Sequence, residues 1–337
     1  MEARCYTKLE KGSVQCYLCR HRCLIQDKER GICKVRENQS GTLITLVYGK
    51  IIACHVDPVE KKPLFHFMPG SQTYSLATVG CNFRCKFCQN SSISQMPIDH
   101  HGMIMGDDFT PSKIVELALL HQCKSISFTY TEPTIFFEFA IDTAMLAKEK
   151  GLYTIFVSNG YMSDETIELM SGNIHAANID LKAFNSDFYK QYCGAKLENV
   201  LKSLRTLKAK GIFLEITTLL IPGLNDEMQE LKSLAEFIVS DLGAETPWHI
   251  SRFHPTYQLL NRPQTPVQSL LQAREIGIKA GLRYVYVGNV PGEKGESTFC
   301  WKCGKLLIDR HGFFIRDNRI KNNRCSYCDA YIDMFNP

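Results

Sequence analysis

The sequence predicts an α/β fold: a partial (β/α)6 TIM-like barrel, with an N-terminal Cys-rich segment before it and a C-terminal zinc-ribbon-like tail after it. Two observations lead to this prediction. Short runs rich in Ile, Val, Phe, Tyr and Thr alternate with helical segments between residues 74 and 288, which is typical of parallel strands joined by crossover helices. Clustered cysteines lie on both sides of this region. We therefore expect three parts: residues 1–70, 71–290 and 291–337.

Six strands, and a candidate for a seventh, are predicted in the alternating region. They span residues 74–79, 125–130, 153–158, 176–181, 212–221 and 248–253, with 284–288 as the candidate. Because a closed barrel of this type needs eight units, six or seven indicate a barrel that stays open on one side, where a large substrate can enter. A doubly wound open sheet is the alternative that the same alternation allows.

Helices fit between the strands. Thr110 is a capping residue and Pro111 takes the first helical position of the segment 110–123. The segment 136–151 ends in Lys150 and Gly151, a cationic last turn followed by a glycine. The same logic predicts helices within the segments 163–170, 197–211, 225–243 and 265–281.

The composition is that of a globular protein without a membrane segment. Hydrophobic residues make up 45% and charged residues 22% of the 337 residues, which is ordinary for a soluble chain. No apolar run reaches the ~18 residues of a membrane span, and the polar first 16 residues argue against a secretory signal. We expect a cytoplasmic protein with no membrane partner. The net charge of +4 neither requires nor excludes nucleic acid.

The 15 cysteines are the most informative feature of the composition. In a reducing cytosol, clustered thiols indicate metal binding or catalysis rather than disulfides. Eleven of them form clusters, with four near the N-terminus, three after the first predicted strand and four near the C-terminus. The remaining four, which we interpret as small buried hydrophobes, are Cys5, Cys54, Cys123 and Cys193.

The three-cysteine cluster, Cys81, Cys85 and Cys88, follows the first strand of the parallel array. Active sites of strand–helix folds lie at this carboxyl end, because the loops there converge. Thiolates at this density bind soft metals or iron–sulfur clusters. Three thiolates leave one iron of a [4Fe–4S] cluster without a protein ligand, so that a cofactor can bind there. A zinc knuckle completed by His66, His100 or His101 is the alternative.

The C-x-x-x-C-x-x-C loop, with Phe87 before its last cysteine, resembles that of the radical S-adenosylmethionine (SAM) superfamily. This resemblance implies that the open iron binds the amino and carboxylate groups of SAM. One-electron reduction then cleaves the sulfonium to a 5′-deoxyadenosyl radical, which abstracts hydrogen from a substrate. An electron donor of flavodoxin or ferredoxin type is implied, because the cleavage needs a low-potential electron.

Motifs at the ends of later strands resemble elements of the same superfamily. In "TYTEP", Glu132 matches the residue that binds the amino group of the cofactor, while residues 129–131 replace the usual glycines. In "SNG", Ser158 and Asn159 match a threonine–asparagine–glycine element of glycyl-radical activating enzymes. Val157 stands where those enzymes usually carry an aspartate.

Three further strand ends extend the resemblance. In "DLK", Asp180 and Lys182 match a triplet whose lysine lies near the cofactor carboxylate. "LIPGLND" at 220–226 resembles the element that lies against the adenine. In "RFHP", His254 is placed to donate to the same carboxylate. The resemblance implies that these residues, with Glu132 and the "SNG" pair, shape a SAM site.

Longer segments narrow the resemblance. Those before the first strand ("DPVEKKPLFHFMPG"), after the cysteines ("FCQNSSIS") and at the sixth strand ("PWHISRFHPTY") look like the AmmeMemoRadiSam-system radical enzymes. These are relatives of the pyruvate formate-lyase activating enzymes. The substrate stays open: a small molecule, an RNA, or a glycine of a partner protein, as for a glycyl-radical-enzyme activase. A non-catalytic multi-zinc module that binds RNA or protein is the competing hypothesis.

The flanking clusters each offer four cysteines. Zinc and an auxiliary [4Fe–4S] cluster that passes electrons both fit the N-terminal set, in which His21 is a possible replacement ligand. This set comprises Cys16, Cys19, Cys23 and Cys33. Two C-x-x-C knuckles near the C-terminus indicate a zinc ribbon, whose folding energy would come from the metal. They comprise Cys300, Cys303, Cys325 and Cys328.

A hairpin-like insert lies between the two C-terminal knuckles. It carries Phe313 and Phe314 among basic residues, a combination that suits RNA or an acidic partner. A solvated face on a structural ribbon is the simpler interpretation, given the mild net charge of the chain. The basic residues are Arg310, Arg316, Arg319, Lys321 and Arg324.

Overall fold

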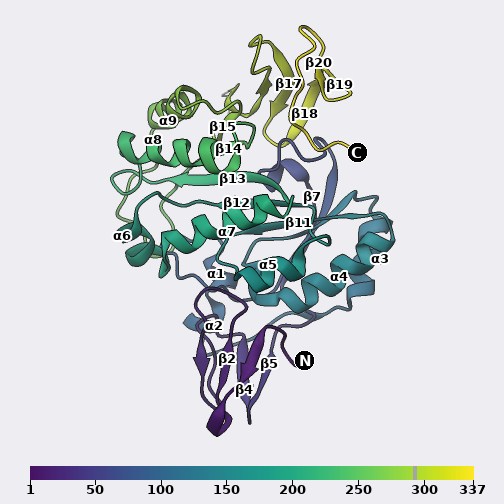
Figure 1. Ribbon diagram of the computed structural model, residues 1–337, viewed down its shortest axis with the longest axis vertical. Helices are drawn as coiled ribbons and strands as arrows, with labels where there is room; N and C mark the ends of the chain where they lie inside the picture. The colour runs from purple at the N-terminus through teal and green to yellow at the C-terminus, as the bar shows by residue number, and fades with distance from the viewer. Residues whose placement is uncertain (291–293) are drawn as a thin grey trace.

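The computed structural model describes residues 1–290 and 294–337, and its centre is an eight-stranded sheet (Figure 1). Seven of these strands pair in parallel in chain order. They are β8 (Gln72–Ala77), β10 (Ser125–Phe128), β11 (Tyr153–Ser158), β12 (Ala176–Asp180), β13 (Phe213–Leu220), β14 (Trp248–Arg252) and β15 (Val285–Gly288). The eighth, β7 (Ala53–Pro58), pairs antiparallel with β8.

The strand order distinguishes the two predicted architectures. Each crossover advances by one strand in the same direction, and right-handed crossovers of this kind place their helices on one face of the sheet. A doubly wound sheet would reverse direction at a switch point. The prediction of a partial barrel is therefore confirmed. In the described chain the sheet begins at β7 and ends at β15. The segment 284–288, the candidate for a seventh strand, therefore belongs to the sheet as β15.

The predicted helices cover the outside of this sheet. Their observed bounds are α3 (Pro111–Leu120), α4 (Phe137–Glu149), α5 (Asp164–Met170), α7 (Leu197–Ala209), α8 (Met228–Phe237) and α9 (Val267–Lys279). The Thr110 side chain accepts a hydrogen bond from the Lys113 amide at 3.2 Å, as its capping role predicts. Gly151 follows α4 with a φ of +73°, a conformation that glycine adopts without strain.

Shorter helical turns fill several connections. They are η1 (Glu10–Gly12), η2 (Val59–Lys61), α1 (Ser91–Ser94), α2 (Met96–Asp99), η3 (Pro133–Phe136), α6 (Ser186–Phe188), η4 (Tyr189–Cys193), η5 (Ile238–Leu242) and η6 (Lys294–Glu296). Two of these, η4 and η5, are π-helical. Among the described residues, no helix is both long and apolar enough to cross a membrane.

The N-terminal unit consists of small antiparallel sheets, shown in purple in Figure 1. One sheet contains β1 (Tyr6–Lys8), β2 (Val14–Cys16) and β3 (Leu24–Ile25), another β4 (Arg36–Gln39) and β5 (Thr42–Thr45), and β6 (Lys50–Ile51) pairs with β9 (Asp107–Asp108). The unit packs on the loop after β11, where the Arg20 amide donates to the Tyr161 carbonyl at 3.1 Å. A buried ion pair of 2.6 Å between Arg36 and Glu138 joins it to α4.

The C-terminal tail is zinc-ribbon-like and packs against the barrel. Its strands are β16 (Thr298–Phe299), β17 (Leu306–His311), β18 (Phe314–Asn318), β19 (Ile320–Lys321) and β20 (Arg324–Cys325). β17 and β18 form the expected hairpin. The predicted start of the tail, residue 291, falls on residues 291–293, which lie outside the described residues.

One basic residue of the insert is not on a solvated face. Arg310 is buried, lies 3.7 Å from Glu60, and donates a 2.8 Å hydrogen bond to the Phe65 carbonyl. Its guanidinium also stacks on the Phe65 ring, 4.4 Å from the centroid. For this residue the simpler interpretation is wrong, because β17 turns that side chain toward the segment that precedes β8. Arginine is thus used here to hold the tail on the barrel.

A chain of buried hydrogen bonds continues from Arg310. Its guanidinium donates to Thr298 Oγ1 at 2.6 Å, and Thr298 Oγ1 lies 2.8 Å from the Tyr286 hydroxyl. The Tyr286 hydroxyl lies 2.6 Å from His66 Nε2, and His66 Nδ1 lies 2.8 Å from the Asp333 carbonyl. A carbonyl only accepts, so Nδ1 carries a proton, and in the neutral ring Nε2 accepts from the Tyr286 hydroxyl. Burial lowers the pKa of His66 to about 4.

This chain predicts an acid-sensitive attachment of the tail. Between pH 7.5 and pH 5 the unfolded His66 side chain takes up a proton but the folded one does not. The free energy of unfolding therefore decreases as the pH is lowered. A lowering of the His66 pKa from 6.5 to about 4 corresponds to a decrease of about 2 kcal/mol in the free energy of unfolding over this interval. The His66→Gln variant should be less stable than the parent at pH 7.5, and this gap should narrow at pH 5. Thermal unfolding midpoints measure both, and a gap that does not change with pH would contradict the assignment.

Candidate active site

The "TYTEP" turn after β10 is held by residues from the segment that precedes β8. Tyr130 has a φ of +62°, in the left-handed region that glycine occupies more readily than other residues. Its hydroxyl donates to Asp57 Oδ2, and the Lys62 ammonium lies over its ring, 4.5 Å from the centroid. Its carbonyl accepts from Asn90 Nδ2 at 2.7 Å. These contacts stabilise the conformation for which the resembling elements use glycine.

Glu132, in the same turn, joins the end of β10 to the end of β11. Its Oε1 accepts from the Thr134 amide at 3.0 Å, the Thr134 hydroxyl at 2.6 Å and the Ser158 hydroxyl at 2.7 Å. Its Oε2 accepts from the Asn159 amide at 2.8 Å. Burial raises the pKa of Glu132 above its usual value, although these hydrogen bonds act in the opposite direction. A carboxylate has about four acceptor positions, so a direct bond to the cofactor's ammonium would displace one of these donors.

Donors surround the sulfurs of the three-cysteine loop. The Phe83 amide donates to Cys81 Sγ at 3.3 Å, and Asn159 Nδ2 lies 3.8 Å from the same sulfur. The Ser94 hydroxyl lies 3.1 Å from Cys88 Sγ. Burial raises the pKa of Cys81 well above its usual value, so a thiolate here needs a metal to stabilise its charge. The loop therefore combines three potential metal ligands with hydrogen-bond donors for their sulfurs.

Cys193 lies beside Cys85, although the sequence suggested only a small buried hydrophobe. It ends the π-helical turn η4, and its carbonyl accepts from the Arg84 amide at 2.9 Å. A hydrogen bond from Cys193 lowers the pKa of Cys85. The thiol of Cys193 thus lies close enough to a predicted ligand sulfur to change its pKa. The two cysteines lie far apart in the sequence, so no argument based on spacing could have found this contact.

The ends of β12 and β13 add a fixed positive charge. Lys182 Nζ pairs with Asp180 Oδ2 at 2.8 Å and lies 5.8 Å from the centroid of the Phe87 ring in the cysteine loop. Burial opposes its charge, but Asp180 and Cys85 hold the pKa of Lys182 well above its usual value. Asn225 of "LIPGLND" donates to the Lys182 carbonyl at 2.6 Å. The ammonium is therefore charged and positioned next to the three-cysteine loop.

His254 lies apart from these residues. It is exposed, and both of its ring nitrogens lie within 3.1 Å of Gln264 Nε2. It lines a cleft of about 820 Å³ between the end of β14 and the tip of the β17–β18 hairpin, a size within the usual range of ligand pockets. Arg252, Glu296 and Phe313 line the same cleft. The structure thus brings together the other predicted cofactor residues but places His254 at this opening.

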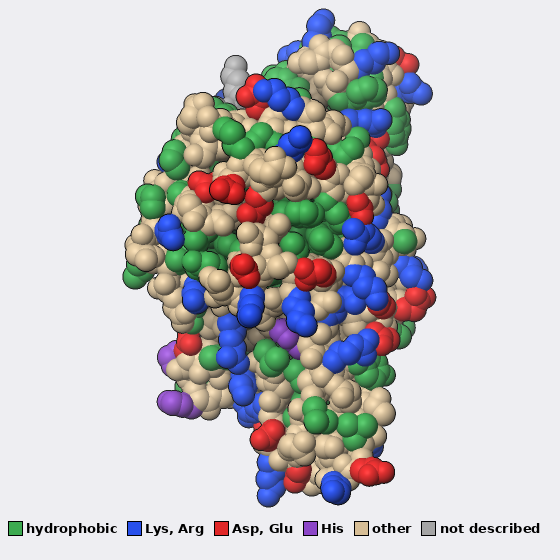
Figure 2. Space-filling model, turned by 60° about the vertical axis from the view of Figure 1, so that its left-hand side comes forward, with side chains coloured by type: hydrophobic (Ala, Val, Ile, Leu, Met, Phe, Trp, Pro, Cys, Tyr) green, Lys and Arg blue, Asp and Glu red, His purple; other side chains and the backbone are tan. Residues whose placement is uncertain are grey.

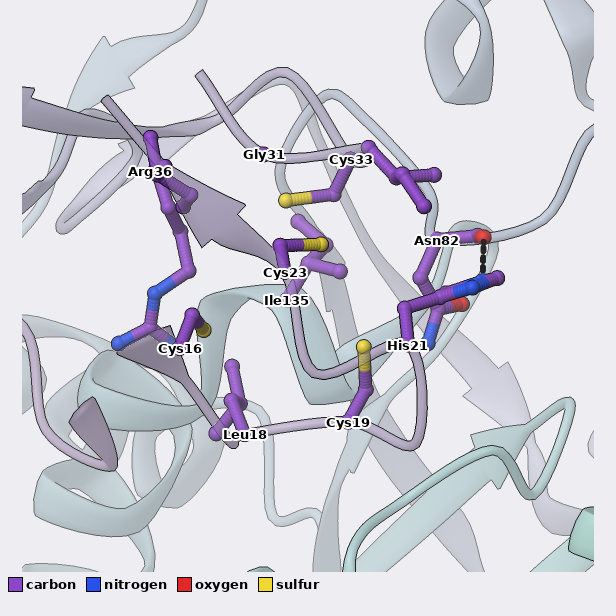
Figure 3. A pocket seen from close by; sticks show the side chains of 12 residues that line it. Cys16, Leu18, Cys19, His21, Cys23, Gly31, Cys33, Arg36, Asn82 and Ile135 are labelled. Carbon is purple, nitrogen blue, oxygen red and sulfur yellow. Dashed lines mark hydrogen bonds between the residues drawn. The ribbon is translucent and has the colours of Figure 1, made fainter. Parts of the chain in front are cut away.

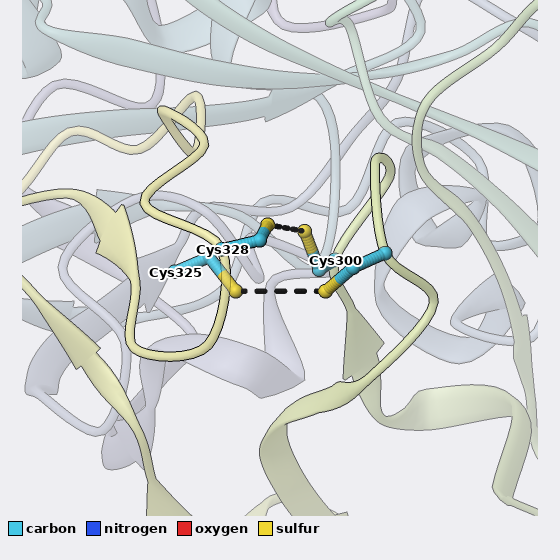
Figure 4. A group of neighbouring side chains, drawn as sticks. Cys300, Cys325 and Cys328 are labelled. Atoms are coloured by element: carbon cyan, nitrogen blue, oxygen red, sulfur yellow. Dashed lines mark hydrogen bonds between the residues drawn. The ribbon is translucent and has the colours of Figure 1, made fainter.

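The C-terminal knuckles have the geometry of a single-metal site. Across residues 1–290 and 294–337, they are the only group of three or more potential ligand atoms within 4.8 Å of one another. The Cys300 and Cys328 sulfurs are 3.6 Å apart and those of Cys303 and Cys325 are 3.8 Å apart (Figure 4). Four sulfurs at about 2.3 Å from one tetrahedral ion are separated by about 3.8 Å. The group is therefore able to bind one metal ion.

The other two clusters do not have this geometry. Neither the three-cysteine loop nor the N-terminal set brings three ligand atoms within 4.8 Å of one another in the described structure. A zinc knuckle at Cys81 is disfavoured, and none of its expected histidine partners completes it. The donor set instead fits an iron–sulfur cluster, in which each thiolate binds a different iron and the sulfurs stand farther apart.

Comparison with known proteins points to the same kind of site. A family model described as the radical SAM superfamily matches residues 75–235. An uncharacterized protein of Methanocaldococcus jannaschii is 45% identical over 335 residues, 99% of each chain. A putative glycyl-radical enzyme activating enzyme of the same organism is 27% identical over 226 residues, covering 65% of this chain and 80% of the relative.

The chain belongs to the radical SAM superfamily. This radical SAM enzyme is related to the activating enzymes of glycyl-radical enzymes. Among solved structures, Streptococcus suis SuiB bound to S-adenosylmethionine has a TM-score of 0.50 at 14% identity, covering 68% of this chain and 53% of that chain. At this identity the similarity shows the fold alone.

The contact between Cys193 and Cys85 predicts different effects of removing either thiol. Cys85→Ala should lower the iron content of anaerobically purified protein by about four atoms per chain, because a cluster ligand is lost. Cys193→Ala should keep the iron and shift the reduction potential to more negative values, because only a hydrogen bond to sulfur is lost. Iron analysis and a redox titration measure both effects. Equal loss of iron in the two variants would show Cys193 to be a ligand.

Proposed function

We propose that this radical SAM enzyme cleaves S-adenosylmethionine reductively and abstracts hydrogen from a substrate that enters through the cleft lined by His254. One observation carries the proposal. Asn159 lies 3.8 Å from Cys81 Sγ, and its backbone amide is bound by the carboxylate of Glu132. The cysteine loop and the "TYTEP" and "SNG" motifs therefore form one connected site at the carboxyl edge of the barrel.

Each residue of this site has a role that follows from its contacts. Cys81, Cys85 and Cys88 hold a [4Fe–4S] cluster and leave one iron for SAM. Bound together, the cluster and SAM supply one-electron cleavage of the sulfonium and a 5′-deoxyadenosyl radical. Glu132 positions Ser158 and Asn159 from behind, as its four hydrogen bonds indicate.

Charge complementarity assigns Lys182 to the carboxylate of SAM. Its ammonium is kept protonated by Asp180, 2.8 Å away, and a charged donor binds a carboxylate more strongly than a neutral one. His254, which lines the cleft at the end of β14, is proposed to bind the same carboxylate. The structure has these two residues on different strand ends, β12 and β14.

A flavodoxin- or ferredoxin-type protein is proposed to supply the electron. The three-cysteine loop exposes Arg84 and Lys86, and Lys190 is exposed on the neighbouring π-helical turn. Figure 2 shows Lys and Arg side chains gathered at the level where the N-terminal unit meets the barrel. A basic surface of this kind accelerates association with an acidic donor.

Two substrate classes fit the cleft. A small molecule is admitted by its volume of about 820 Å³. A glycine of a partner protein is the second candidate, because a relative is named as a putative glycyl-radical enzyme activating enzyme. The half-exposed Phe313 and the exposed Phe314 at the hairpin tip offer an apolar contact for such a partner. In that role the protein acts as an activase.

Cleavage of SAM tests the proposal directly. Anaerobically reconstituted protein, reduced with dithionite, should convert SAM to methionine and 5′-deoxyadenosine, and Cys88→Ala should abolish this activity. Cys123→Ala is the matched control, because Cys123 is buried away from the described clusters and should keep the activity. Liquid chromatography with mass spectrometry measures the product. Zinc in all three cysteine clusters and no product would support the multi-zinc module instead.

We also propose that the metal of the C-terminal tail is zinc, because its sulfur separations match zinc–thiolate bonds. Cys303→Ser should lower the zinc content by about one atom per chain and expose the tail to proteolysis, because the metal supplies its folding energy. Metal analysis and limited trypsin digestion measure these effects. Unchanged zinc with an intact tail would contradict the assignment.

A further inference from the structure

Four cysteines of the N-terminal unit line one cavity. They come from β2, from the loop that follows it and from the segment before β4, and Figure 3 shows the sulfurs of Cys19, Cys23 and Cys33 directed into the space between them. His21 also lines the cavity, but its Nε2 is hydrogen-bonded to the Asn82 carbonyl at 2.8 Å and its ring packs on Tyr161. The cysteines rather than His21 are therefore the ligands that this cavity offers.

The spacing of these sulfurs differs from that of the C-terminal site in the same molecule. At the tail, four cysteines bring their sulfurs within 4.8 Å of one another; the described N-terminal set does not bring even three so close. A single tetrahedral zinc ion requires separations of about 3.8 Å. A four-iron cluster binds each thiolate through a different iron and so holds the sulfurs farther apart.

Two residues that line the same cavity have buried donors without a partner among the described residues. Arg36 is 2% exposed, and its Nε and Nη1 have no hydrogen-bond partner among the described residues. Asn82 is 1% exposed, and its Nδ2 likewise has no partner in the described structure. Both side chains line the cavity, and Figure 3 shows the Arg36 guanidinium beside Cys16. Buried donors are rarely left unsatisfied, so these groups point to an acceptor-rich ligand such as a sulfide cluster.

We infer that Cys16, Cys19, Cys23 and Cys33 hold a second [4Fe–4S] cluster, and that Arg36 and Asn82 donate hydrogen bonds to its sulfur atoms. Of the two metals that the spacing of these cysteines allows, the structure favours iron–sulfur over zinc. Arg36 has a second function in this arrangement, because its Nη2 pairs with the buried Glu138 at 2.6 Å and so fixes the guanidinium at the cavity wall.

The second cluster would lie next to the three-cysteine loop. Asn82 follows Cys81 in the chain. Its Oδ1 accepts from Asn159 Nδ2 at 2.7 Å, and the same residue lines the N-terminal cavity. A Cβ atom placed on Gly80 would lie 3.4 Å from the Cys33 carbonyl. This proximity suits a relay: one electron from a ferredoxin- or flavodoxin-type protein reduces the second cluster and passes to the metal at Cys81, and no bond forms or breaks. The relay rests on the proposed function, whereas the metal assignment does not.

Metal analysis of a variant without the SAM-site cysteines tests the assignment. The triple variant Cys81→Ala, Cys85→Ala, Cys88→Ala, purified anaerobically as the full chain, should keep about four iron and about four sulfide per chain, with about one zinc from the tail. Reduced with dithionite, it should show the electron paramagnetic resonance signal of a [4Fe–4S]⁺ cluster. A triple variant with about two zinc and no iron would overturn the inference.

A conservative change of Arg36 supplies a second readout. Arg36→Lys, placed in the triple variant, keeps the charge opposite Glu138 but removes the Nε and Nη1 donors. The iron content should stay the same, while the midpoint potential should move to more negative values, because hydrogen bonds to sulfur stabilise the reduced cluster. An unchanged potential would remove Arg36 from the site.

The relay is tested with the double variant Cys19→Ala, Cys33→Ala. With reduced flavodoxin as donor, it should release 5′-deoxyadenosine at least about tenfold more slowly than the parent. With dithionite, which reaches the SAM site directly, the difference should be smaller. Equal slowing with both donors would contradict the relay. A parent that cleaves no SAM with dithionite would instead contradict the proposed function, and the iron count of the triple variant would still decide the second site.

Discussion

The carboxylate of Glu132 is the interaction on which the rest of the site depends. It accepts four hydrogen bonds in a position that is 1% exposed, and in doing so it fixes the ends of β10 and β11 relative to each other. A buried charge without such donors is costly, so the turn cannot rearrange without losing several bonds at once. Glu132 holds the backbone of Asn159 in this way. It thereby places the Asn159 side-chain amide next to Cys81 and Asn82.

Tyr130 stands at a position where the resembling elements have glycine, and hydrogen bonds to its side chain stabilise its backbone conformation. A left-handed φ of +62° is unfavourable for tyrosine, and the phenol offsets this cost by bonding Asp57, a residue also bound by Lys62 at 2.6 Å. Burial opposes the charge of Asp57, but the hydrogen bonds from Lys61, Lys62 and Tyr130 hold its pKa well below its usual value. The "DPVEKK" segment therefore acts as a support for the "TYTEP" turn.

Three cysteine clusters in one molecule show how geometry distinguishes metals that spacing does not. The tail brings four sulfurs to the separations of one tetrahedral ion. The other two clusters are wider in the described structure, and donors surround each of them. Because Gly80 and Asn82 flank Cys81 and also lie against the N-terminal set, the N-terminal unit lies next to the three-cysteine loop.

The sequence by itself determined the parallel strands, the capped helices, the place of the three-cysteine loop after the first strand, and the tail knuckles, because each depends on local periodicity or short spacing. It also placed Asp180 and Lys182 at one strand end. Only the tertiary structure decided that the sheet stays in chain order, that Cys193 lies beside Cys85, that Arg310 is buried, and that His254 stands apart at the cleft. It alone set the distances between sulfurs, since these depend on how segments far apart in the chain pack against one another.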